Sequence, residues 1–232
     1  QRANAIILLD TAGNPSDAGV YILLSTGFSN VTQEFCKELP LYGPPAACDP
    51  WTFMGQIATD PAVRGKRGLV VMNGAMGGQN TPMWDAPTQP SYARVAANLA
   101  DAGFSEEQVQ IVWMKLAHAS PTRPLPDPAA DAFLLEVDAA KAVRAMKVRY
   151  PNLKMVFIGS RTYGGWSIGP HNPEPYAYEN AFAVSWLVDD QIRQMAGGGV
   201  SPDAGDLDYS TGVAPWLAWG PYFWTDGLRG RS

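Results

Sequence analysis

Four short apolar segments, each followed by a segment of helical character, constrain the fold of this chain most strongly. The apolar segments lie at 20–26, 68–75, 109–115 and 154–160. They are continuously apolar rather than alternating, which is typical of strands covered on both faces. The segments predicted as helices are 31–39, 50–59, 91–102, 129–150 and 176–196. Strands that alternate with helices in this way predict a three-layer α/β/α fold with a mainly parallel sheet.

The rest of the chain adds little regular structure to this prediction. Residues 1–19 predict a short strand or extended arm followed by a turn. Residues 213–228 are rich in aromatic residues without a clear period, which predicts an aromatic loop over an edge of the sheet. Asp49 and Pro50 predict the start of the helix over 50–59, because an Asp cap before a first-turn Pro is a common helix start. No repeat, low-complexity run or linker occurs, so we expect one domain over residues 1–232.

Composition argues against several kinds of partner. The net charge of −5 disfavours nucleic acid, because such binding needs a basic patch. No apolar run approaches the ~20 residues that a membrane span needs. The glycines at 74–78 lack a following Gly-Lys-Ser/Thr, and no dinucleotide motif or cluster of metal ligands stands out. We therefore expect a small-molecule partner, no nucleic acid, no membrane span, no cofactor and no metal.

Cys36 and Cys48 are the two cysteines of the chain. They bracket residues 37–47, a segment with three prolines and one glycine, as in a disulfide staple of an exported protein. Two free buried thiols are the alternative. Zinc is disfavoured because no partner His/Cys pair lies nearby.

Gln1 is not a natural start and no signal peptide is visible, so we expect a processed protein that is secreted or periplasmic.

The segment Gly27-Phe28-Ser29-Asn30 joins the first predicted strand to a predicted helix. Such a turn lifts its serine to the carboxyl edge of the sheet, where open α/β sheets bind their ligands. The N–H groups at the following helix start are available to stabilise an oxyanion. The alternative is an ordinary strand–helix turn with a capping Ser or Asn.

Four segments meet at that edge if the sheet is parallel, namely 27–30, 74–81, 115–120 and 160–166. The first brings Ser29 and the second brings closely spaced glycines, whose N–H groups approach a substrate without a side chain between. The third brings Lys115 and His118, and the fourth brings Arg161 and Tyr163. A serine, backbone donors and a candidate base together indicate acyl transfer.

These residues resemble the SGNH (GDSL-type) hydrolases, nearest to the branch of sialate O-acetylesterase-like carbohydrate esterases. The first block of that branch, Gly-Gln-Ser-Asn, is similar to Gly27-Phe28-Ser29-Asn30, and its Gly-Gly-Thr with a following Trp is similar to Gly77-Gly78-Gln79 with Trp84. The third block, Trp-x-Gln-Gly-Glu, corresponds to residues 113–117. The whole chain also resembles bacterial SGNH-like proteins of undefined substrate, through Ser160–Gly165, Asn172–Glu179 and Ala214–Tyr222. The resemblance implies a flavodoxin-like sheet.

The resemblance also implies roles for individual residues. Ser29 would be the nucleophile, and its N–H with that of Gly78 would hold the oxyanion. The third donor of the family, an Asn or Gln side chain, falls at Lys115, where a positive charge would take its place. Their positions at the strand ends make five further residues candidates for substrate contact, with packing at the rim as the alternative for the last two: Asn30, Gly77, Gln79, Arg161 and Tyr163.

The catalytic base is the main departure from the family. Its late Asp-x-x-His block has no counterpart up to Ser232, which predicts that this stretch lacks the block. Without a base a serine hydroxyl is a weak nucleophile. His118 and His171 are the candidates here, since imidazole titrates near neutral pH. The alternative for each is a loop histidine with a structural hydrogen bond.

The sequence therefore predicts a secreted serine esterase that hydrolyses an acyl ester, with a carbohydrate O-acetyl ester as the candidate substrate. The absent Asp-x-x-His block and the abundant tryptophans leave a second prediction, a non-catalytic carbohydrate-binding or surface protein on the same scaffold. A lyase or transferase on a related sheet is the third.

Overall fold

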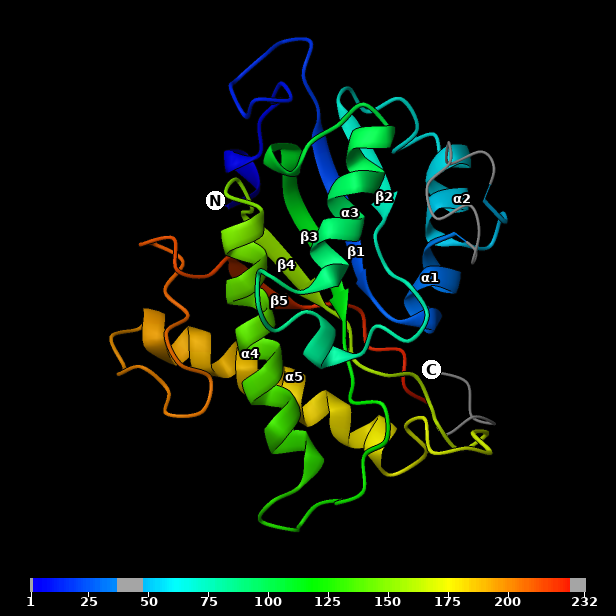
Figure 1. The fold of residues 1–232 in the computed structure, drawn as a ribbon, viewed down its shortest axis with the longest axis vertical. Helices are drawn as coiled ribbons and strands as arrows, with labels where there is room; N and C mark the ends of the chain where they lie inside the picture. Colours follow the sequence, from blue (N-terminus) through cyan, green and yellow to red (C-terminus); the bar gives the residue numbers. More distant parts are fainter. Residues whose placement is uncertain (1, 37–47, 226–232) are drawn as a thin grey trace.

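The fold is described from a computed structural model, which places residues 2–36 and 48–225. Its described residues form one five-stranded sheet in the order β2-β1-β3-β4-β5, and every neighbouring pair is parallel (Figure 1). The strands are β1 (Tyr21–Gly27), β2 (Leu69–Asn73), β3 (Val109–Lys115), β4 (Met155–Ile158) and β5 (Trp216–Trp219). This order is the flavodoxin-like one, in which the chain reverses direction across the sheet beside β1.

Helices cover both faces of the sheet. They are α1 (Ser29–Phe35), α2 (Phe53–Thr59), α3 (Pro90–Asp101), α4 (Asp131–Arg149) and α5 (Tyr176–Met195), with short 3₁₀ turns at Arg2–Ala5, Thr81–Met83 and Glu106–Gln108. Alternate strand residues point to opposite layers: Leu24 and Val112 pack in the core formed with α3, α4 and α5, whereas Leu23 and Trp113 pack with α1 and α2. The predicted three-layer α/β/α fold is confirmed.

The fifth strand corrects one prediction. Residues 213–228 were expected to form an aromatic loop, but Trp216–Trp219 pairs with Met155–Ile158 of β4. Its burial does not alternate cleanly, because it lies at the sheet edge and Leu217 is its one fully buried residue. Pairing with β4 therefore decides its structure, and the sequence period does not show it. Residues 226–228 lie outside the described residues.

The helix over 50–59 also begins later than predicted. Asp49 is not its cap: Thr52 is, and its side chain accepts a hydrogen bond from the N–H of Gly55 at 3.2 Å, so that α2 starts at Phe53. The predicted helix over 31–39 starts two residues early, at Ser29, and its positions 37–39 lie outside the described residues. The other predicted helices and strands fall within two residues of the observed bounds.

Cys36 and Cys48 form a disulfide, as predicted, with their Cα atoms 4.8 Å apart. Both sulfur-bearing side chains are buried in the core between α1, α2 and β2. The bond thus fixes the end of α1 to the segment that leads into α2. Among the described helices, none has the length and apolar character that crossing a membrane requires.

Candidate active site

The turn between β1 and α1 presents Ser29 at the carboxyl edge of the sheet. Gly27 ends β1 with a φ of +143°, and a Cβ there would lie 2.3 Å from the backbone oxygen of Lys115. Only glycine fits this position without displacing β3, because the backbone conformation is unfavourable for other residues and the space is filled. Phe28 caps the helix, and Ser29 is its first residue. The close packing of β1 on β3 therefore sets where Ser29 stands.

The glycine-rich loop after β2 lies against this turn. The N–H of Met76 donates to the backbone oxygen of Gly27 at 3.1 Å. A Cβ built at Gly77 would lie 3.9 Å from Cβ of Ser29, whereas one at Gly78 would meet open space. The N–H groups of Ser29 and Gly78 make no hydrogen bond within the described ranges. Two backbone donors thus remain for a ligand beside the serine.

A buried amide joins the elements that carry these loops. Asn73, at the end of β2, accepts a hydrogen bond from the hydroxyl of Ser25 at 2.8 Å and donates to the backbone oxygen of Thr32 at 2.9 Å. Its oxygen also accepts from the N–H of Ala75 at 3.3 Å. Asn73 therefore holds together strands β1 and β2, helix α1 and the start of the glycine-rich loop.

A cavity of about 340 Å³ opens in front of Ser29. That volume is at the small end of the range for ligand pockets. Its described lining carries polar and basic side chains and no carboxylate. The lining residues are Phe28, Ser29, Asn30, Gly78, Asn80, Ala117, His118, Ala119, Arg161, His171 and Asn172.

His118 is held at the cavity wall by two neighbours. Its Nε2 lies 3.2 Å from Oδ2 of Asp138 on α4, and its backbone oxygen accepts from the side chain of Asn172 at 2.6 Å. Asp138 also bonds to Nζ of Lys141 at 2.8 Å. The hydrogen bond from His118, supported by Lys141, lowers the pKa of Asp138 despite its partial burial. An ionised Asp138 accepts a hydrogen bond from Nε2–H, which leaves Nδ1 of His118 as the nitrogen with a free lone pair.

Arg161 enters the cavity from the loop after β4. Its backbone N–H donates to Oδ1 of Asn180 on α5 at 3.0 Å. Its guanidinium donates through Nη1 to Oδ1 of Asn30 at 3.1 Å and lies 4.9 Å above the ring of Phe28. Asn30 and Phe28 flank Ser29, so the arginine contacts both neighbours of the proposed nucleophile.

The structure places other predicted site residues away from this cavity. Nζ of Lys115 is buried against Oε1 of Glu34 at 2.6 Å, and burial lowers its pKa. The side chain of Gln79 accepts from Arg94 at 2.7 Å. Tyr163 packs edge-on against Trp166 and Trp224. Lys115, Gln79 and Tyr163 are absent from the described lining.

The remaining predicted residues lie at the cavity or beside it. Ser29, Asn30, Gly78, Arg161 and His118 share its wall, and Gly77 adjoins Ser29. His171 also lines the cavity but is exposed, and its Nδ1 lies 3.4 Å from the backbone oxygen of Ala119. Of the two candidate bases, His118 is thus the one held by a carboxylate.

Three residues with roles here were not singled out from the sequence. Asp138 lies in the middle of a long helix, where the sequence suggests only an ion pair with Lys141 three residues on. Asn80 follows the glycines, and no hydrogen bond within the described ranges engages its side chain. Asn172 adopts a φ of +58°, a conformation that Asn tolerates better than most residues. Its position between His171 and Pro173 was the one sequence feature that pointed to a turn conformation at Asn172.

The described residues contain no group of three or more His, Cys, Asp or Glu side chains arranged to hold a metal ion.

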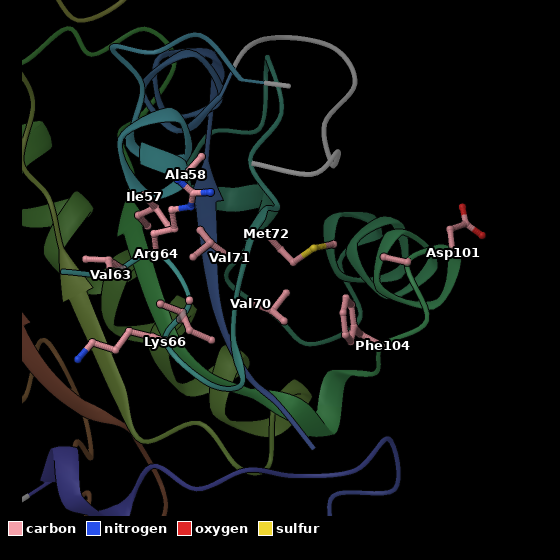
Figure 2. Close-up of a pocket in the computed structure, with 13 residues that line it drawn as sticks. Ile57, Ala58, Val63, Arg64, Lys66, Val70, Val71, Met72, Asp101 and Phe104 are labelled. Atoms are coloured by element: carbon pink, nitrogen blue, oxygen red, sulfur yellow. The ribbon is translucent and has the colours of Figure 1, made fainter. Parts of the chain in front are cut away.

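A larger cavity, of about 590 Å³, lies at the free edge of β2 between α2 and α3. Figure 2 shows Val71 on the side of Ile57 and Arg64, and Val70 and Met72 on the side of Phe104. Its charged lining groups are Arg64, Lys66 and Asp101, without a serine, cysteine or histidine. The smaller cavity therefore brings together the serine and histidines that the sequence singles out, whereas the described lining of the larger one has neither residue type.

Comparison with known proteins gives a likeness of fold alone. No protein-family model matches the chain, and no curated protein matches it. Among solved structures, a variant of Axe2, an acetylxylan esterase from Geobacillus stearothermophilus, aligns at 14% identity over 79% of this chain and 76% of that one, with a TM-score of 0.44. A GDSL-like lipase from Parabacteroides merdae aligns at 11% identity over 85% and 94%, with a TM-score of 0.43. At these values the likeness carries no argument about activity.

Proposed function

We propose that this protein is a serine esterase that hydrolyses small acyl esters, with Ser29 as nucleophile and His118 as base. One observation supports the proposal above all. Ser29, the unbonded N–H of Gly78 and a histidine held by a carboxylate line the same small cavity. A nucleophile, a base and a group that orients the base are the arrangement that acyl transfer needs.

The chemistry follows from these positions. Nδ1 of His118 takes the proton of the Ser29 hydroxyl as Oγ bonds to the ester carbonyl carbon. The N–H groups of Ser29 and Gly78 hold the oxyanion, and the amide of Asn80 is the third donor that we propose in place of Lys115. The alcohol leaves with the proton from His118. Water then attacks the acyl-enzyme and gives a proton to His118, which passes it to Oγ of Ser29 as the bond from Oγ to the acyl carbon breaks and the carboxylic acid is released.

Two further features bear on the substrate and the location. The resemblance to carbohydrate esterases favours an O-acetyl ester, and the small cavity agrees with a short acyl group. The Cys36–Cys48 disulfide agrees with a secreted or periplasmic protein, because such bonds persist in oxidising compartments.

A row of aromatic side chains favours a second candidate function, carbohydrate binding without catalysis. Along α5 the ring centroids of Tyr178 and Phe182 lie 5.5 Å apart, and that of Phe182 lies 5.9 Å from that of Trp186. Trp186 stacks on Phe133 of α4 at 5.0 Å. Tyr178, Phe182 and Phe133 are exposed, so their faces are available to stack on sugar rings.

The test compares hydrolysis of p-nitrophenyl acetate by wild-type protein, Ser29→Ala and Ser120→Ala. Ser120 is a matched control, since it is exposed in the loop after β3 and does not line the cavity. We expect turnover by wild type and Ser120→Ala and its loss in Ser29→Ala. Equal rates for wild type and Ser29→Ala would refute the assignment. Absence of turnover by folded wild type, together with binding of soluble oligosaccharides, would favour the second candidate.

A further inference from the structure

Arg161 is a buried cation in the cavity, and within the described residues it forms no ion pair at contact distance. Its side chain is 8% exposed, yet it lines the space in front of Ser29. One of its nitrogens, Nη1, donates to Asn30, and its buried Nε has no acceptor. Within the described ranges Nη2 makes no hydrogen bond, and no carboxylate oxygen lies within 4.0 Å of the guanidinium.

The two nearest carboxylates are engaged elsewhere. Glu34 bonds to Lys115, which is a second buried cation beside Arg161. Glu174 accepts from the N–H of Gly164 at 2.7 Å, and from Trp224 and Tyr178 at 2.8 and 3.0 Å. Two cations and two carboxylates thus lie in this region, but neither carboxylate bonds to Arg161 or lines the cavity. Arg161 is therefore the charged group that the described lining presents to the cavity without a carboxylate beside it.

A buried charge that forms no ion pair is costly, so a protein keeps one where a ligand pairs with it or where it holds other groups in place. Burial lowers the pKa of Arg161, but a guanidinium stays protonated at any physiological pH. The net charge of the whole chain is −5, which makes a basic cavity a local feature and not a reflection of overall composition.

We propose that the cavity selects esters that carry a carboxylate in addition to the scissile ester, and that this carboxylate accepts a hydrogen bond from Nη2 of Arg161. The substrate class is the O-acylated hydroxy acid or sugar acid. The proposal rests on the esterase function above for the reacting bond, but the recognition of the carboxylate is independent of it. A guanidinium suits this role because its fixed donors match the planar geometry of a carboxylate.

The first test uses two substrates of the same shape, 4-acetoxybenzoate and 4-acetoxybenzamide, each corrected for its rate of spontaneous hydrolysis. We expect wild type to prefer the carboxylate by about 10- to 100-fold in kcat/KM, the size of a charge-assisted hydrogen bond. Equal kcat/KM values for the two substrates, or a preference for the amide, would overturn the proposal.

Variants assign the preference to one side chain. Arg161→Gln is expected to lower the ratio of kcat/KM for the carboxylate to kcat/KM for the amide by about 10- to 100-fold. Arg161→Lys should retain part of the preference. The control is Arg144→Gln, since Arg144 is a partly buried arginine that donates to backbone oxygens remote from the cavity. An equal fall for both substrates in Arg161→Gln means that Arg161 only positions Phe28 and Asn30, and it refutes the proposal.

Binding separates this proposal from the esterase assignment. 4-Hydroxybenzoate and 4-hydroxybenzamide are titrated into wild-type and Ser29→Ala proteins, with tryptophan fluorescence or NMR shifts as the readout. Tighter binding of the carboxylate in both proteins supports the anion site even if neither hydrolyses an ester. Equal or absent binding of the two refutes the site even if Ser29 proves catalytic. If Arg161→Gln does not fold, the wild-type comparison still decides.

Discussion

Nε2 of His118 and Oδ2 of Asp138 lie 3.2 Å apart, which joins the loop after β3 to the middle of α4. Both side chains are largely buried, with 17% and 22% of their surfaces exposed. The contact engages Nε2 and fixes the orientation of the imidazole ring. Nδ1 is then the ring nitrogen that remains for another partner. In the familiar serine triad the carboxylate bonds to Nδ1 and Nε2 serves the serine, so the roles that we propose for the two ring nitrogens are exchanged.

Asp138→Asn tests this pairing. The variant should keep its fold but favour the wrong tautomer, since an amide nitrogen can donate to Nε2 and leave Nδ1 protonated. We expect kcat for p-nitrophenyl acetate to fall by about 10²- to 10⁴-fold. Lys141→Gln is the control, because it removes the other partner of Asp138 at an exposed position. A full-activity Asp138→Asn variant would show that His118 does not depend on Asp138.

Asn80→Ala tests the third oxyanion donor. If the Asn80 amide holds the developing oxyanion, its loss should lower kcat by about 10²- to 10³-fold with little change in KM. Asn14→Ala, at an exposed turn remote from the site, is the matched control. A rise in KM alone would instead place Asn80 in ground-state binding.

Removing either partner of the Lys115–Glu34 pair is expected to have a different effect on stability. Glu34→Gln leaves a buried ammonium without a counter-charge and should lower the free energy of unfolding by ~1–3 kcal/mol, less than for a fully buried pair because Glu34 is 38% exposed. Lys115→Met replaces the ammonium by an apolar group of similar length and should be near neutral. Urea unfolding measures both effects. A stable Lys115→Met variant with strongly reduced kcat would restore the role in oxyanion stabilisation that the sequence predicts for Lys115.

Glu136 makes stability depend on pH. Burial, with the nearby charge of Asp203, raises its pKa from 4.5 to about 7. The folded state therefore binds more protons than the unfolded state between these values, and stability falls as pH rises through that window. Glu136→Gln should match wild type at pH 4 and be more stable by ~2 kcal/mol at pH 8. Urea unfolding curves of both proteins at pH 4 and pH 8 measure the free energies of unfolding. If the variant and wild type differ by the same free energy at both pH values, the prediction is contradicted.

The sheet and its helices were predictable because each element carries its own signal. The four continuous apolar segments read as strands buried on both faces, and Gly27, at the end of the first, marks the turn that presents Ser29. The strand at Trp216–Trp219 has no such signal, since its structure depends on pairing with β4. The local pattern thus predicts β1 to β4, including the edge strand β2, and misses β5, in which Leu217 is the one fully buried residue.

The site was predictable only to the level of its loops. Strand ends of a parallel sheet converge, so Ser29, Gly78, His118 and Arg161 were expected at one edge. Where each side chain points depends on neighbours far along the chain. Lys115 turns to Glu34, 81 residues away, while His118 meets Asp138 on a helix whose sequence gives no sign of it.

Covalent labelling of Ser29 by a fluorophosphonate tests the proposed nucleophile most directly, because the probe reacts with a serine only when the serine is activated. Wild-type protein, Ser29→Ala and His118→Ala are incubated with the probe and mapped by peptide mass spectrometry. We predict one adduct, on Ser29, that is lost in Ser29→Ala and strongly slowed in His118→Ala. Folded wild type that leaves Ser29 unmodified, under conditions in which a known serine esterase is labelled to completion, would contradict the assignment of Ser29 as a catalytic nucleophile.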